Sequence, residues 1–289
     1  MSRPQCVLAF LRHPTMQKLR IAVSFFTHTP IRYWARNFCY FAGLLLWKAL
    51  RIRRSSQKVL YFGEMKVAGD SEGGSGLVFL HEVCVRRTYE SVRNPPNIEI
   101  RMLFDVGANS GFVALSQCQE HPILSAVCFE PHPKTFSILQ KNIALNQLNS
   151  RIRSVHAAVG AHSGTCYLRI REDSSMGTVE PMPQIESPNR NSVQVPLIAL
   201  DDFSRQHGIW PDLIKIDVEG FELEVLRGAT ECLRRAKRVI LEYHSPLLKE
   251  QSESLLCGTG YLCRVHGSLI FADAREPESR CPAAGRLPA

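Results

Sequence analysis

The chain has 289 residues, of which 45% are hydrophobic and 21% are charged, and this is the composition of an ordinary globular protein with one large or two small domains. The net charge of +8 is concentrated at the beginning, because the chain carries many Lys and Arg but no Asp or Glu up to Arg54. The basic character therefore does not by itself indicate nucleic acid, and no nucleic-acid partner is expected.

Residues 1–75 are predicted to form a basic and apolar N-terminal arm that ends in a flexible linker, G-D-S-E-G-G-S-G at 69–76. The apolar run 38–47 is about half the length that a membrane span needs. Because it has aromatic residues and flanking cations, the segment 32–54 suits a helix packed on the main domain or a helix at a membrane surface. A helix that anchors the chain in a membrane is a third alternative. The expected location is the cytoplasm, with a peripheral membrane contact through this arm.

Ten cysteines are scattered along the chain without any C-x-x-C pair, so a zinc ribbon is not expected. Several lie inside apolar runs such as S-A-V-C-F-E. This pattern is typical of buried free thiols in a reducing compartment.

Residues 76–275 are predicted to form one domain of alternating strands and helices, followed by a disordered tail at 276–289. Short apolar runs predict strands and runs with helical spacing predict helices; the strands are expected at 101–106, 125–130, 152–160, 212–217 and 238–244, and the helices at 111–120, 133–146 and 221–236. This order implies a Rossmann-like α/β fold with parallel strands and helices on both faces. The end differs, because 260–266 and 269–274, joined by Gly267 and Ser268, predict an antiparallel hairpin.

A glycine turn, F-D-V-G-A-N-S-G-F at 104–112, follows the first strand of this domain. In such sheets ligands bind at the carboxyl ends of the strands, where Gly107 allows a sharp turn and Gly111 lets the next helix begin close to the ligand. Asn109 stands where the dinucleotide fingerprint needs its second glycine, which argues against a pyrophosphate. Asp105, just before the turn, would repel phosphates and favour an ammonium group.

Glu130 ends the second strand, at about the place where a carboxylate accepts hydrogen bonds from ribose hydroxyls. A ligand with a ribose, an amino-acid end and no phosphate fits both Asp105 and Glu130, and S-adenosylmethionine is such a ligand. Two alternatives stay open: an NAD-dependent oxidoreductase of the same fold class, and a binding module that holds the cofactor without turnover.

Three residues at the ends of later strands are the candidates for catalysis. Asp217 ends the fourth strand and could orient or deprotonate an acceptor hydroxyl. Glu242 and His244 end the fifth strand and share a face, so that one of them could be the base. Together with Asp217 they could instead ligate a divalent cation, but a hydrogen-bonded pair explains them equally well, and no metal is expected.

Three charged residues near Asp217 in the sequence are expected to have structural roles. Lys215 is expected to form an ion pair with a nearby acid. Glu219 and Glu222 are expected to begin the following helix, where acids complement the helix dipole, although a functional role is as plausible. The polar, proline-containing segment 173–195 is predicted to be a long loop that covers the active site and helps to choose the acceptor.

The order of motifs resembles the FkbM-type methyltransferases over roughly residues 100–246. The segments that carry the resemblance are F-D-V-G-A-N-S-G-F, C-F-E-P-H-P, A-A-V-G, V-P-L-I-A-L-D-D-F, D-L-I-K-I-D-V-E-G-F-E-L-E-V-L-R-G-A and V-I-L-E-Y-H. The resemblance implies a class I S-adenosylmethionine-dependent fold with a seven-stranded sheet, and methyl transfer to a hydroxyl of a sugar, glycan or other natural product. Residue by residue it implies a cofactor site formed by Asp105, Gly107, Ala108, Asn109, Gly111, Glu130 and, near the adenine, Ala158.

Overall fold

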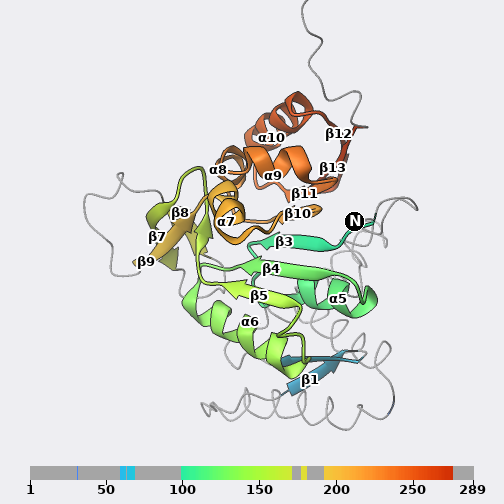
Figure 1. Ribbon diagram of the computed structural model, residues 1–289. Helices are drawn as coiled ribbons and strands as arrows, with labels where there is room; N and C mark the ends of the chain where they lie inside the picture. The colour runs from blue at the N-terminus through green and yellow to red at the C-terminus, as the bar shows by residue number, and fades with distance from the viewer. Residues whose placement is uncertain are drawn as a thin grey trace, which may run out of the picture.

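The computed structural model describes residue 31 and residues 59–62, 64–68, 99–170, 177–180 and 192–275. Its centre is a seven-stranded sheet with the strand order β12-β13-β11-β10-β3-β4-β5 (Figure 1). The strands are β3 (Met102–Val106), β4 (Ser125–Phe129), β5 (Ile152–Val155), β10 (Leu213–Ile216), β11 (Arg238–Glu242), β12 (Tyr261–His266) and β13 (Leu269–Ala274).

Strand direction confirms the predicted architecture. The pairings from β5 through β4, β3 and β10 to β11 are parallel, and β13 is antiparallel to both of its neighbours, β11 and β12. Gly267 in the turn of the final hairpin has the expected positive φ of 59°. Strand β3 lies between β4 and β10, so the strand order reverses there, and in such sheets the crevice at this switch point is where ligands bind.

Helices cover both faces of this sheet because successive side chains of each strand point to opposite sides. On one face Leu103 packs in a core cluster with side chains of α5 (Phe112–Glu120) and α6 (Pro133–Leu145). On the other face Phe104 packs in a second cluster with side chains from the remaining helices, which are α7 (Leu200–His207), α8 (Glu222–Arg227), α9 (Thr230–Arg235) and α10 (Pro246–Gly258). Pro133 occupies the first turn of α6, as predicted.

A second, four-stranded sheet of order β6-β9-β7-β8 corrects two predictions. It contains β6 (Ala158–Val159), β7 (Gly164–Ile170), β8 (Gly177–Glu180) and β9 (Ser192–Ile198). The expected strand 152–160 is therefore two strands in two sheets, and 173–195 is not one continuous loop. Period-two spacing of Val193, Val195 and Leu197 was the available signal, since these side chains pack on the small core of this sheet. Residues 171–176 and 181–191 lie outside the described residues, so the covering loop stays a prediction.

The helix expected at 221–236 is two short helices, α8 and α9, which Gly228 separates. A Cβ on Gly228 would lie 2.0 Å from the carbonyl oxygen of Gly160, so the close approach of these two backbones requires glycine and interrupts the helix. Glu222 begins α8 as expected, but Glu219 does not begin a helix: it has a φ of 53° in the turn before α8. Helices α7 and α10 were not predicted, although Ser245 caps α10 directly before Pro246 in the pattern typical of a helix start.

Near the N-terminus, β1 (Val59–Phe62) and β2 (Met65–Ala68) form an antiparallel hairpin whose second strand packs on α6. The predicted membrane-contacting segment 32–54 and the tail 276–289 lie outside the described residues, and the domain boundaries stay predictions. In the part of the chain that the structure describes, no helix is both long and apolar enough to cross a bilayer.

Candidate active site

The glycine turn runs from the carboxyl end of β3 to the first residue of α5. Gly107, Asn109 and Gly111 all have positive φ, at 72°, 51° and 84°. A Cβ on Gly107 would lie 1.8 Å from the carbonyl oxygen of Asp217, and a Cβ on Gly111 would lie 2.4 Å from Leu139 Cδ1. Glycine is thus required at 107 so that the turn can pass directly over the end of β10, which brings the predicted cofactor loop and the predicted catalytic acid together.

Glu130 lies at the end of β4 beside this turn, with only 6% of its surface exposed. Its Oε2 accepts a hydrogen bond from the backbone N–H of Asn109 at 2.8 Å, and its Oε1 accepts one from the N–H of His132 at 2.8 Å. Burial raises the pKa of Glu130 to about 7, against the opposing effect of these two hydrogen bonds. Each oxygen keeps a further lone pair, so the carboxylate is oriented by the protein and can still accept hydrogen bonds from a ligand.

Asp105 is fully buried, and its charge is balanced inside the protein. The Nζ atom of Lys215 lies 3.3 Å from Asp105 Oδ1 and 3.5 Å from Asp217 Oδ2, and it donates a hydrogen bond to the Gly107 carbonyl at 2.8 Å. The predicted ion-pair role of Lys215 is confirmed. Because this ammonium group belongs to the protein, a direct contact of Asp105 with the ammonium of a ligand stays a prediction.

His244 follows β11 and faces three acids from the segment after β10. Its Nδ1 lies 2.6 Å from Glu222 Oε1, and since a carboxylate only accepts, Nδ1–H is the donor. Its Nε2 lies 3.5 Å from Glu219 Oε2 and 3.8 Å from Asp217 Oδ1. The hydrogen bond to Glu222, with the nearby acids, raises the pKa of His244 to about 9. The sequence grouped Asp217 with His244 as candidates, and the structure brings their side chains to within 3.8 Å, while their catalytic roles stay predictions. The contact of His244 with Glu222 was not predicted, because it joins the end of β11 to the start of α8 through tertiary packing.

Two other predicted site residues are placed differently. Glu242 precedes His244 by two positions, and its Oε1 accepts a hydrogen bond from Ser268 Oγ at 3.0 Å, toward the final hairpin. Ala158 is buried in the small core of the second sheet with Cys166 and Leu168. The charge of Glu242 also acts on Lys215 and on Glu219, and the functional roles of Glu242 and Ala158 stay predictions.

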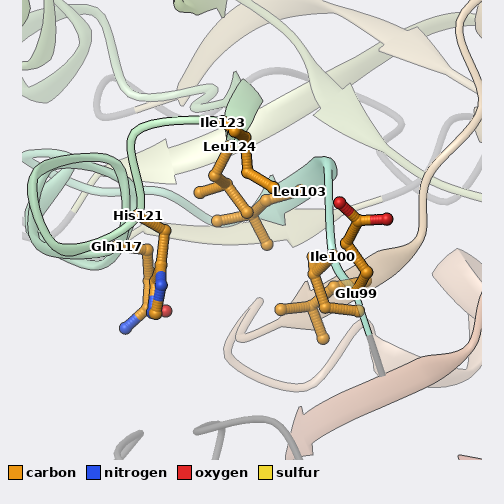
Figure 2. A pocket seen from close by; sticks show the side chains of 8 residues that line it. Glu99, Ile100, Leu103, Gln117, His121, Ile123 and Leu124 are labelled. Carbon is orange, nitrogen blue, oxygen red and sulfur yellow. The ribbon is translucent and has the colours of Figure 1, made fainter. Parts of the chain in front are cut away.

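A small pocket lies at the other end of the strands. It is lined by residues from the amino end of β3, the end of α5 and the start of β4, including Ile100, Leu103, His121 and Leu124 (Figure 2). Its volume of about 60 Å³ is far below the roughly 300 Å³ or more of ordinary small-molecule sites. Since the amino and carboxyl ends of parallel strands lie at opposite edges of a sheet, this pocket is not part of the candidate active site.

The strand order, the final antiparallel strand pair and the glycine turn beside a strand-end acid define a Rossmann-like methyltransferase of class I. The family model described as the methyltransferase FkbM domain matches residues 105–263. The chain belongs to this FkbM methyltransferase family, and S-adenosylmethionine is the cofactor of the family. This finding also sets aside the alternative of an NAD-dependent oxidoreductase.

Curated relatives are similar at low identity. "Methyltransferase sdnD" of Sordaria araneosa is 27% identical over 211 residues, which are 62% of this chain and 80% of that protein. "Hexuronic acid methyltransferase AglP" of Haloferax volcanii is 28% identical over 145 residues, which are 50% of this chain and 56% of that protein. "2-O-methyltransferase NoeI" of Sinorhizobium fredii is 26% identical over 164 residues, which are 52% of this chain and 65% of that protein.

The residues of the site fit this cofactor. The donor set around the turn offers what a nucleoside with an amino-acid end requires: an oriented, buried carboxylate at Glu130 for ribose hydroxyls, and a turn without side chains at Gly107 and Gly111 for close approach. When bound, the cofactor supplies a methyl group on a positively charged sulfur. Carboxylates outnumber cations at this edge, and this suits a cationic ligand: Glu130 lies near Asp105 and Lys215, and Glu219 lies near His244 and three other acids, Asp217, Glu222 and Glu242.

Proposed function

We propose that the protein is an O-methyltransferase whose acceptor is a hydroxyl group of a sugar, a glycan or another small natural product. The observation that carries the proposal is the position of Asp217. Its backbone carbonyl touches the glycine turn, and its carboxylate faces the imidazole of His244. Proton-accepting groups therefore lie at the same strand edge as the residues that fit the methyl donor.

Each residue has a separate task in this proposal. Glu130 and the turn at Gly107 and Gly111 bind and orient the donor. Lys215 holds the turn and the Asp217 carboxylate in place through its contacts with Gly107 and Asp217. Asp217 orients the acceptor hydroxyl and receives its proton as the oxygen attacks, which is a form of general-base help that contributes about 10²–10⁴-fold to rate.

His244 completes the acceptor side of the site. Its ring is fixed by Glu222, a side chain with no exposed surface, and its Nε2 faces the crevice near Asp217. A ring fixed in this way can position an acceptor oxygen at Asp217, in the manner of a residue oriented by a third group.

Two relatives support the choice of a sugar hydroxyl. The name of one describes a hexuronic acid methyltransferase and the name of the other a 2-O-methyltransferase. These activities are those of the relatives. Since this chain is only 28% and 26% identical to them, a sugar hydroxyl as its acceptor is proposed.

The test is a product assay with the full chain and isotopically labelled S-adenosylmethionine. Methyl glucuronide, methyl glucoside and an amine control of similar size serve as acceptors. We expect label in the sugar products, with NMR placing the new methyl group on oxygen. Label transferred to the amine alone would contradict the proposal. Donor binding with no label on either sugar would remove these simple sugars as acceptors.

A further inference from the structure

His244 presents one ring nitrogen to a hydrogen bond and the other to two carboxylates. The Nδ1 contact with Glu222 has the short distance of a charge-assisted hydrogen bond, 2.6 Å. The Nε2 distances to Glu219 and Asp217, 3.5 Å and 3.8 Å, are longer than the roughly 2.7–3.2 Å of a good hydrogen bond. These two carboxylates therefore surround Nε2 without forming close hydrogen bonds to it.

The longer distances are those of ligand atoms that share one metal ion. Nitrogen and oxygen ligands at about 2.0–2.2 Å from a cation lie roughly 3–4.4 Å from one another, depending on the angle between them. One ligand atom each from Asp217, Glu219 and His244 lies within 4.8 Å of the other two. The three ligands come from different places in the chain: Asp217 follows β10, Glu219 lies in the turn before α8 with a φ of 53°, and His244 follows β11.

The carboxylate behind His244 is placed as in many metal sites. A metal-bound histidine ordinarily donates its other N–H to a carboxylate, which fixes the tautomer and the ring orientation. Glu222 has this position, with no exposed surface, and its Oε1 also accepts a hydrogen bond from the N–H of Gly220 at 2.9 Å. Its Oε2 is buried and forms no hydrogen bond, so the carboxylate is oriented by the two hydrogen bonds that Oε1 accepts.

We propose that Asp217, Glu219 and His244 Nε2 form a divalent-cation site beside the acceptor crevice. One imidazole and two carboxylates suit a first-row ion such as Mn²⁺ better than Mg²⁺, which seldom takes nitrogen ligands. The cation replaces the proton on Nε2, because only the neutral ring can ligate. An acceptor hydroxyl that reached the open side of the ion would be polarised by it, and its proton would pass to a carboxylate at this edge.

The experiment is a titration of the full chain, freed of metals with a chelator, with Mn²⁺ as the probe. Free Mn²⁺ is measured by its electron paramagnetic resonance signal, so the assay needs neither donor nor acceptor. We expect one bound ion per chain. We expect Glu219→Gln and His244→Gln to weaken binding at least tenfold, and Glu222→Gln to weaken it by about 10–100-fold, because the orienting carboxylate is lost.

Glu224→Gln is the matched control, because Glu224 lies in the same helix as Glu222 but pairs with Arg227. It should bind Mn²⁺ as the wild type does. The proposal is overturned if the wild type binds no Mn²⁺ at millimolar concentration, or if the folded Glu219→Gln variant binds it as tightly as the wild type. Glu219 is the safest test of folding, since its side chain is 37% exposed. Failure here would leave the proposed methyl transfer standing, because the product assay does not presuppose a metal.

Discussion

Glu130 combines burial with a proposed task, the binding of ribose hydroxyls, that needs its charge. Its pKa is raised to about 7 by burial, so the side chain takes up a proton as the pH falls through neutrality. The ionised form accepts hydrogen bonds from ribose hydroxyls better than the protonated form does. We therefore expect the affinity for S-adenosylhomocysteine to fall as the pH is lowered from about 8 to about 6.

Isothermal titration at several pH values measures this directly. Glu130→Gln should bind more weakly than the wild type at pH 8, and its affinity should change little over the same range. A wild-type affinity that is flat with pH, or one that rises toward pH 6, would remove Glu130 from the ribose role.

Asp217 is the residue on which turnover should depend most. Asp217→Asn keeps the size of the side chain but removes the proton acceptor, and we expect turnover to fall by about 10²–10⁴-fold. The affinity for S-adenosylhomocysteine should stay within a few fold of the wild type, since the proposed cofactor residues follow β3 and β4. Wild-type turnover of the variant, measured with the labelled donor, would contradict the catalytic assignment.

Lys215 balances buried charge, and its loss should affect stability first. Lys215→Met leaves Asp105 buried without its cation, and breaking a buried pair in this way costs about 3–5 kcal/mol of unfolding free energy. Adding Asp105→Asn should restore part of that loss, because the fully buried charge is then removed and only the partly exposed Asp217 is left without its cation. Urea unfolding measures the unfolding free energy of the single and the double variant. Equal unfolding free energies would show that Lys215 does not compensate the charge of Asp105.

At the scale of elements, helix α6 joins the N-terminal hairpin to the glycine turn. The side chain of Asn142 has no exposed surface; its Oδ1 accepts from the Ala68 N–H at 2.7 Å and its Nδ2 donates to the Ser110 carbonyl at 2.8 Å. Asn146 holds the same hairpin through the N–H and carbonyl of Lys66, at 2.9 Å and 2.7 Å. Both asparagines thus hold the hairpin, and Asn142 also ties it to the glycine turn through Ser110.

This difference gives a matched pair of variants. Asn142→Ala should lower the unfolding free energy by about 1–3 kcal/mol for each buried group it leaves unpaired, and it should also weaken S-adenosylhomocysteine binding. Asn146→Ala should loosen the hairpin but keep the affinity. Equal affinities in both variants, measured by titration calorimetry below their melting temperatures, would show that the turn does not need Asn142.

The elements also show what the sequence could predict. Strands β3, β4, β10 and β11 were predicted because they are buried on both faces and are therefore mostly apolar, although they also carry charged residues such as Asp105 and Lys215. The second sheet was missed because its strands interrupt a polar, proline-containing segment. The cofactor turn was predictable from the neighbouring residues along the chain. The contacts of Asn142 with Ser110 and of Glu222 with His244 were not, since they join positions 32 and 22 residues apart through tertiary packing.

For the whole molecule, the fold brings residues from four strand ends to one edge. Glu130, the glycine turn, Asp217 and His244 follow β4, β3, β10 and β11, which are neighbours in the sheet around the switch point. This arrangement puts the residues proposed for the donor and those proposed for the acceptor after adjoining strands. We propose that the turn and Glu130 hold the S-adenosyl donor at this edge.

The most direct test compares the thermal unfolding of the full chain in three states: without ligand, with S-adenosylhomocysteine and with NAD. Ligand at about 100 times its dissociation constant should stabilise the protein by roughly 2.7 kcal/mol, which a melting curve resolves. We predict a higher melting temperature with S-adenosylhomocysteine, a much smaller change in Glu130→Ala, and no change with NAD. A melting temperature that rises with NAD alone, or that rises equally in the wild type and Glu130→Ala, would contradict the account.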